Sequence, residues 1–163
     1  MDYPPLLAQG LHPRNWTELH DLCATGFPLS QSRATLLAGL RAIVDRLCAE
    51  NIVGDLWVDG SLLTQKLEPS DVDFVLILQP QVYLNGTPGQ RAMIEWLGTR
   101  DVAVRAQTKH DYGCDTYICF DTPPGHPLYP GRDMRQYWQN QFGNDRSSSP
   151  KGIAVLMIPG GVQ

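Results

Sequence analysis

LWVDGSLLTQKLEPSDVDFVLIL, residues 56–78, is the stretch from which the rest of this chain is interpreted. Its first three residues are apolar and suit a buried strand, which Gly60 and Ser61 then break with a turn. Glycine permits close approach of a ligand to the backbone, and Ser61 adds a hydroxyl group. Residues 71–78, DVDFVLIL, predict a second buried strand. The stretch therefore predicts two strands with polar groups gathered around one turn.

The second strand opens with two aspartates, Asp71 and Asp73, which project to the same face because strand side chains alternate. Two neighbouring carboxylates repel each other unless a cation lies between them or one pKa is raised. Carboxylate oxygens suit Mg²⁺ or Mn²⁺, which also take oxygens from a phosphate. The simpler alternative is that Asp71 caps a turn after Pro69 and that Asp73 is incidental. That alternative does not explain the preceding Gly-Ser turn.

The combination of Gly60-Ser61, nine intervening residues and Asp71-x-Asp73 resembles the signature of the nucleotidyltransferase superfamily. That superfamily includes DNA polymerase beta, aminoglycoside nucleotidyltransferases and the minimal nucleotidyltransferase antitoxins. The resemblance implies an α/β (α+β) fold, a nucleotidyltransferase-like mixed β-sheet with helices packed mainly on one face. It implies that the Gly-Ser turn binds a nucleoside triphosphate and that Asp71 and Asp73 bind Mg²⁺ or Mn²⁺. The longer order of elements is similar to an uncharacterised group of small bacterial nucleotidyltransferase-like proteins.

The resembled superfamily completes its metal site with a third carboxylate on a neighbouring strand, for which Asp115 is the candidate. Residues 114–120, CDTYICF, predict a strand bounded by Gly113 and a pair of prolines. If this strand lies beside the one that begins at Asp71, Asp115 enters at the same depth as the first two aspartates. The alternative is a turn aspartate that follows Gly113.

Three basic residues near these motifs have two interpretations each. Lys66 lies close enough in sequence to the Gly-Ser turn to assist nucleotide binding, or it is a lysine of a surface loop. Arg146 and Lys151 either balance the charge of a bound triphosphate or solvate a loop, and the sequence favours the loop.

The remaining chain is expected to form an extended, proline-rich arm over residues 1–14 and a single domain over 15–163. Apolar residues at helical spacing predict a long helix over 32–50 that covers the sheet, with Arg33 on its solvated side. Further helices are expected over 87–97 and 132–142, a short strand over 101–109 and a closing strand over 153–158. The aromatic residues of 132–142 are expected to belong to the core.

Composition narrows the class of protein. The net charge is −4 and the isoelectric point is about 5.4, which argues against a broad nucleic-acid footprint. Residues 1–5 have no secretory pattern and no run is long enough for a membrane span, so a cytoplasmic protein is expected. Four cysteines show no metal-ligand spacing and are expected to be buried free thiols.

The resemblance and the short chain favour transfer of a nucleoside monophosphate, AMP from ATP, to a macromolecular and specifically a protein acceptor. Few residues follow the motif here, so a separate helical domain that grips the base or acceptor is not expected within this sequence. One alternative is a catalytically inactive binding module of this fold, such as the antitoxin of a toxin–antitoxin pair. Another is an aminoglycoside-like enzyme that modifies a small cationic molecule, with Asp111, Asp121 and Asp133 lining an acidic pocket.

Overall fold

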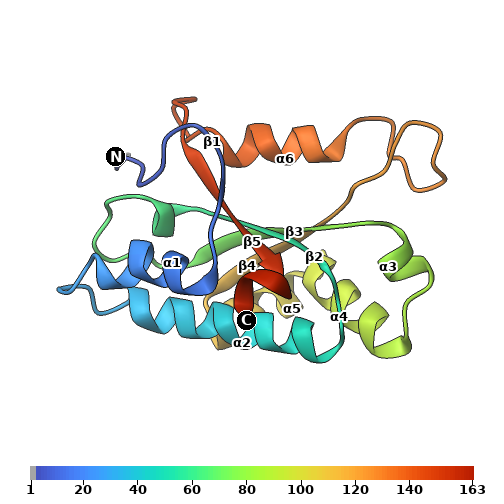
Figure 1. Ribbon diagram of the computed structural model, residues 1–163, viewed down its shortest axis with the longest axis horizontal. Coiled ribbons are helices and arrows are strands. Elements are labelled where there is room, and N and C mark those ends of the chain that lie inside the picture. Colours follow the sequence, from blue (N-terminus) through green and yellow to red (C-terminus); the bar gives the residue numbers. More distant parts are fainter. Residues whose placement is uncertain (1–2) are drawn as a thin grey trace.

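Residues 3–163 of this computed structural model are described, and they contain a mixed five-stranded sheet (Figure 1). The strand order is β1-β5-β2-β3-β4. The central pairs β5·β2 and β2·β3 are antiparallel, whereas the outer pairs β1·β5 and β3·β4 are parallel. The strands are β1 (Gly10–Pro13), β2 (Gly54–Asp59), β3 (Val72–Leu78), β4 (Cys114–Phe120) and β5 (Gly152–Ile158).

Helices are divided unequally between the two faces of this sheet. Figure 1 shows α6 alone above the sheet, while α1, α2, α4 and α5 lie below it. This arrangement confirms the expected α+β class and the packing of helices mainly on one face. The helices are α1 (Trp16–His20), α2 (Arg33–Ala49), α3 (Gln81–Leu84), α4 (Pro88–Gly98), α5 (Val102–Tyr112) and α6 (Met134–Phe142), and a π-helical turn, Asp21–Thr25, follows α1.

Alternation along the strands produces two apolar layers. On the face that the larger helical layer covers, Phe74 and Leu76 of β3 pack with Leu40 and Leu47 of α2 in one buried cluster. On the opposite face a smaller cluster surrounds Trp57, and it includes residues of β2–β5 and Phe142 of α6. Because residues two apart share a face, Asp59, Asp73 and Asp115 belong to the α6 side of the sheet.

The expected strand over 101–109 is wrong, because this segment lies within α5. Asp101 caps the helix, and its Oδ1 atom accepts hydrogen bonds from the backbone N–H groups of Ala103 and Val104. Gly113 ends it with a left-handed φ of 68°. Val102 is 81% exposed, so the alternation of valines did not mark the buried face of a strand.

The N-terminal arm takes part in the sheet. Gly10–Pro13 forms β1 and pairs in parallel with β5. Before it, the Leu6 N–H donates to the Leu63 carbonyl at 2.8 Å, and the Gln65 N–H donates to the Pro4 carbonyl at 2.9 Å. Met1 and Asp2, with which the expected arm begins, lie outside the described residues. The arm therefore contacts the segment that follows the Gly-Ser turn.

No helix in the described part of the chain is both long and apolar enough to cross a membrane. All four cysteines are free, as the sequence predicted; Cys23, Cys114 and Cys119 are buried, whereas Cys48 is only partly buried. Burial raises the pKa of each of these three thiols to about 12.

Candidate functional site

Strand register brings three aspartates into one row across the sheet. Asp73 of β3 pairs with Asp59 of β2 on one side and with Asp115 of β4 on the other. Directly paired residues of neighbouring strands project to the same face, so the three carboxylates adjoin one another. Asp71 lies two residues before Asp73, so its side chain projects to the same face of the sheet. The structure therefore gathers four carboxylates at one end of β2, β3 and β4.

The middle carboxylate of this row has no direct partner within residues 3–163. No hydrogen bond or ion pair reaches the Asp73 side chain, although Asp71 and Asp115 lie nearby. Burial, followed by the charges of Asp71 and Asp115, raises the pKa of Asp73 to about 6. Asp73 is therefore a carboxylate without a direct cationic partner, and the more distant charges of Lys109 and Lys151 oppose the rise in its pKa.

Two lysines approach the outer carboxylates. The Lys109 Nζ atom of α5 lies 2.8 Å from Asp71 Oδ2 and 3.2 Å from Asp115 Oδ2. Hydrogen bonds to these two aspartates raise the pKa of Lys109. The Lys151 Nζ atom lies 3.0 Å from Asp59 Oδ1 and forms a close ion pair with it. Burial raises the pKa of Asp59 to about 7, and Lys151 opposes that change.

Gly60 turns the chain directly beside Asp73. Its φ of 84° lies in the left-handed region, and a Cβ atom built on it would collide with Asp73 Oδ2. A single 3₁₀ turn, Ser61–Leu63, follows. The Thr64 hydroxyl donates to the Ser61 carbonyl at 2.7 Å and closes this turn. The Gly-Ser turn is therefore packed against the aspartate row.

Arg33 holds the segment that follows the turn. Its guanidinium is fully buried and donates to the carbonyls of Leu62, Thr64 and Lys66, with distances from 2.5 to 3.2 Å. It also donates to the Cys23 carbonyl at 2.9 Å. The expectation that Arg33 belongs to the solvated side of its helix is wrong, because these carbonyls replace water around the charge.

The carboxylates and the turn open into a pocket of about 640 Å³. One wall contains Gly60, Ser61 and Lys66 with three of the carboxylates, Asp59, Asp71 and Asp73, and the other contains Tyr137, Trp138 and Phe142 of α6 with the segment that leads to β5. Trp138 contacts Tyr117 with ring centroids 4.8 Å apart, so the aromatic wall is fixed to β4. Arg146 and Lys151 also line this pocket, which places both residues at the site. The pocket is large enough for a nucleotide-sized ligand.

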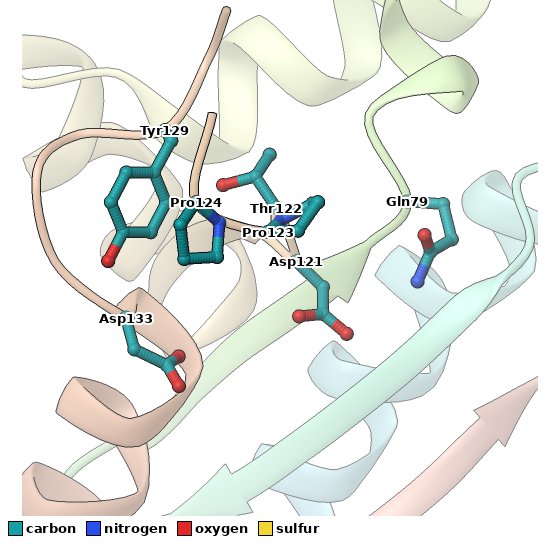
Figure 2. A pocket seen from close by; sticks show the side chains of 7 residues that line it. All are labelled: Gln79, Asp121, Thr122, Pro123, Pro124, Tyr129 and Asp133. Atoms are coloured by element: carbon teal, nitrogen blue, oxygen red, sulfur yellow. The ribbon is translucent and has the colours of Figure 1, made fainter. Parts of the chain in front are cut away.

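A second pocket, of about 390 Å³, lies at the opposite end of β3 and β4 (Figure 2). Asp121 and Asp133 line it, but both are engaged: Asp121 pairs with Arg135 at 3.3 Å, and Asp133 caps α6. Asp111 lines a different hollow, beside Arg46. The three aspartates therefore do not share one acidic pocket. Asp121 directly follows β4 and Asp133 directly precedes α6, whereas Asp111 lies on α5.

The structure brings together the residues that the sequence singled out. Gly60, Ser61, Lys66, Asp71 and Asp73 line the larger pocket, and Asp115 reaches the same row through its register with Asp73. The sequence prediction missed three residues of this region: Asp59, Lys109 and Arg33. Asp59 directly precedes the glycine of the turn, which was an available signal, but the other two depend on tertiary contacts.

A protein-family model matches residues 1–157, almost the whole chain, and its description is "Family of unknown function (DUF6932)". The chain belongs to the DUF6932 family. The matched region contains the aspartate row, the Gly-Ser turn, Lys109 and the aromatic wall of α6. Comparison with curated proteins and with solved structures gives no match.

The donor set of this DUF6932 protein fits a hard divalent cation. Asp71, Asp73 and Asp115 supply carboxylate oxygens, the ligands that Mg²⁺ and Mn²⁺ prefer. The unpaired carboxylate of Asp73 supplies the electrostatic reason for a cation at this place. Within the described residues no three acidic, His or Cys side chains already stand close enough to form a metal centre. Lys109 lies between two of the three carboxylates.

Proposed function

We propose that this protein is a metal-dependent nucleotidyltransferase that transfers a nucleoside monophosphate, AMP from ATP, to a protein acceptor. The observation that carries the proposal is the register of β3 and β4, which sets Asp115 beside Asp73, next to the Gly60-Ser61 turn. That arrangement contains the Gly-Ser turn and the three carboxylates that the resemblance to the nucleotidyltransferase superfamily implies. The pocket supplies the space for a nucleotide in front of these groups.

Each group has a role that follows from its chemistry. The Gly60 N–H and the Ser61 hydroxyl donate to phosphate oxygens of the nucleotide, and the absence of a side chain on Gly60 lets these oxygens approach. Lys66 and Lys151 supply positive charge to the same pocket. Such catalysis depends on positioning and electrostatics, without a covalent protein intermediate.

Asp71, Asp73 and Asp115 would hold Mg²⁺ or Mn²⁺. When bound, such ions lower the pKa of an attacking hydroxyl and neutralise the charge of the departing pyrophosphate. The chain's own carboxylates remain ionised in that state, since a nearby cation lowers the pKa of Asp73. Tyr137 and Trp138 give the opposite wall of the pocket an aromatic surface.

The first test is calorimetric titration of ATP with Mg²⁺, and then of the other three nucleoside triphosphates, into the wild type and into Asp71→Asn/Asp73→Asn. We expect metal-dependent binding of one triphosphate in the wild type and its loss in the double variant. Asp121→Asn/Asp133→Asn, in the second pocket, is the matched control and should bind as the wild type does. If a folded wild type binds no triphosphate with either metal, the proposed reaction is wrong.

A catalytically inactive binding module is the second candidate, and the Lys109 contacts favour it. An ammonium group that already bridges Asp71 and Asp115 offsets part of their charge without a metal. A protein of this kind would bind a partner, as an antitoxin binds its toxin, and that binding would be indifferent to Asp71→Asn and Asp73→Asn. The aminoglycoside-like alternative has less support, because Asp111, Asp121 and Asp133 do not line one pocket.

A further inference from the structure

The Lys109 ammonium occupies a place that a divalent cation would also favour. It lies 2.8 Å from Asp71 and 3.2 Å from Asp115, which come from two adjacent strands. Among residues 3–163, these two carboxylates are the hydrogen-bonding partners of the Lys109 side chain. A cation held only by carboxylates competes directly with any metal that needs the same oxygens.

Arg105, one turn earlier on α5, is held in a different way. Its guanidinium donates to the carbonyls of Thr99 and Thr116, at 3.2 and 2.9 Å, and lies over the Tyr117 ring at 4.7 Å. It approaches Asp115 only to 3.9 Å. Arg105 is therefore fixed by the backbone around it, and it would keep positive charge near Asp115 if Lys109 moved away.

The Lys109 side chain can move without disturbing the fold. It is 46% exposed and extends from the last turn of α5. The helix itself is anchored by other residues: the Trp96 indole N–H donates to the Thr108 hydroxyl at 3.0 Å, and Gly113 closes the C-terminal turn. Exposed lysine ion pairs are weak, because a flexible side chain and water compete for each partner.

We propose that Lys109 is a displaceable counter-cation, which a divalent metal bound to Asp71, Asp73 and Asp115 expels into solvent. This inference rests on the proposed function for the set of ligands, but it concerns metal binding without nucleotide. It means that the Lys109 ammonium offsets part of the charge of the metal-free site and lowers its affinity for the metal. It also predicts a side-chain movement that can be measured without any catalytic turnover.

The direct test follows the reactivity of Lys109 towards acetic anhydride, read peptide by peptide by mass spectrometry. The sequence contains three lysines, Lys66, Lys109 and Lys151, so the assignment is simple. Saturating Mn²⁺ should speed acetylation of Lys109 at fixed pH, because its two carboxylate partners are taken by the metal. Lys66, which has no carboxylate partner, reports any general effect of the salt. In Asp73→Asn, which removes a ligand but neither partner of Lys109, Mn²⁺ should have little effect.

A second test measures Mn²⁺ affinity by electron paramagnetic resonance of the free ion. Lys109→Gln should bind Mn²⁺ roughly fivefold more tightly than the wild type, as loss of a partly exposed ion pair allows. Lys66→Gln removes one positive charge from the pocket that Asp71 and Asp73 line, without removing a competitor, so its gain should be smaller. Equal gains in both variants would mean that only the total charge matters, and the proposal would be wrong.

Other outcomes separate this inference from the proposed function. Mn²⁺ binding that leaves Lys109 acetylation unchanged, or weaker Mn²⁺ binding by Lys109→Gln, overturns the displacement even if ATP binds. An absence of Mn²⁺ binding in the wild type and in Lys109→Gln also overturns it. Mn²⁺ binding that releases Lys109, in a protein that binds no nucleotide, supports the displacement and rejects the nucleotidyltransferase.

Discussion

Gly60 is the residue at which one added methyl group would disturb the site most. It combines a left-handed φ of 84° with close approach to Asp73 Oδ2, and either feature alone disfavours a side chain. The Gly-Ser pattern in the sequence predicted a close approach by a ligand. The structure adds that the glycine is also required by the neighbouring carboxylate.

Gly60→Ala should lower the free energy of unfolding by about 3 kcal/mol, which adds a collision to the cost of about 1–2 kcal/mol for a left-handed alanine. Chemical denaturation with urea measures this change. Gly125→Ala is the control, since Gly125 has a φ of 90° but nothing within 4 Å of a built Cβ atom. Equal losses in the two variants would show that Asp73 does not constrain the turn.

Arg33 is a buried charge with backbone carbonyls as its main partners. Arg33→Met should lower the free energy of unfolding by about 3 kcal/mol or more, because several buried carbonyls lose their donors. Arg41→Met, on the same helix, removes a partly exposed pair with Asp45 and should cost less than about 1 kcal/mol. Urea denaturation measures the stability of both variants. Similar unfolding midpoints would contradict the role of Arg33 as a donor to buried carbonyls.

At the scale of elements, α5 shows why local pattern was insufficient. Alternating valines are typical of a strand, yet Val102 and Val104 are exposed on a capped helix. The residues that indicate a helix lie at its two ends: Asp101 caps the first turn and Gly113 ends the last. Because α5 is a helix, it carries Arg105 and Lys109 on successive turns toward Asp115.

The cysteines test the packing of these elements. Cys114 and Cys119 are buried in β4 and Cys23 in the π-helical turn, while Cys48 near the end of α2 is only partly buried. Burial raises the pKa of the first three thiols to about 12, so little thiolate forms at pH 8. We expect 5,5′-dithiobis(2-nitrobenzoate) to label Cys48 alone in the native protein and all four thiols in urea. Rapid native labelling of Cys114 would contradict the position of β4.

At the scale of the whole molecule, the arm before β1 connects the edge of the sheet to the segment after the Gly-Ser turn. Leu7 is buried, and hydrogen bonds join Leu6 to Leu63 and Gln65 to Pro4. The family match also includes this arm. The turn is therefore supported from two directions, by Arg33 from the helical layer and by the arm from outside.

Deletion of residues 1–9 should remove this outer support and leave β1 in place. Loss of the buried Leu7 side chain should lower the free energy of unfolding by about 2 kcal/mol. Hydrogen exchange should accelerate at the Gln65 amide, whose acceptor is lost, and should change little at β3 amides such as Val75. Unchanged exchange at Gln65 would mean that the arm does not hold the segment.

The sequence by itself determined the local features: the two strands around the Gly-Ser turn, the α2 helix, the strand at 114–120 and the candidate residues Gly60, Ser61, Asp71 and Asp73. These features follow from the periodicity of hydrophobic residues and from motifs of residues close together in the chain, both of which are local. The juxtaposition of Asp115 with Asp73 was only a conditional prediction, because no local pattern states which strands are neighbours.

Tertiary structure alone decided that Asp59 joins the row of aspartates, that Lys109 lies between two of them, and that Arg33 is buried. Each of these facts depends on contacts between residues far apart in the chain, such as Arg33 with Thr64 and Lys109 with Asp71. The sequence around a charged side chain is the same whether that side chain faces water or is surrounded by backbone carbonyls. Only the packing of strands and helices around it determines which of the two it meets.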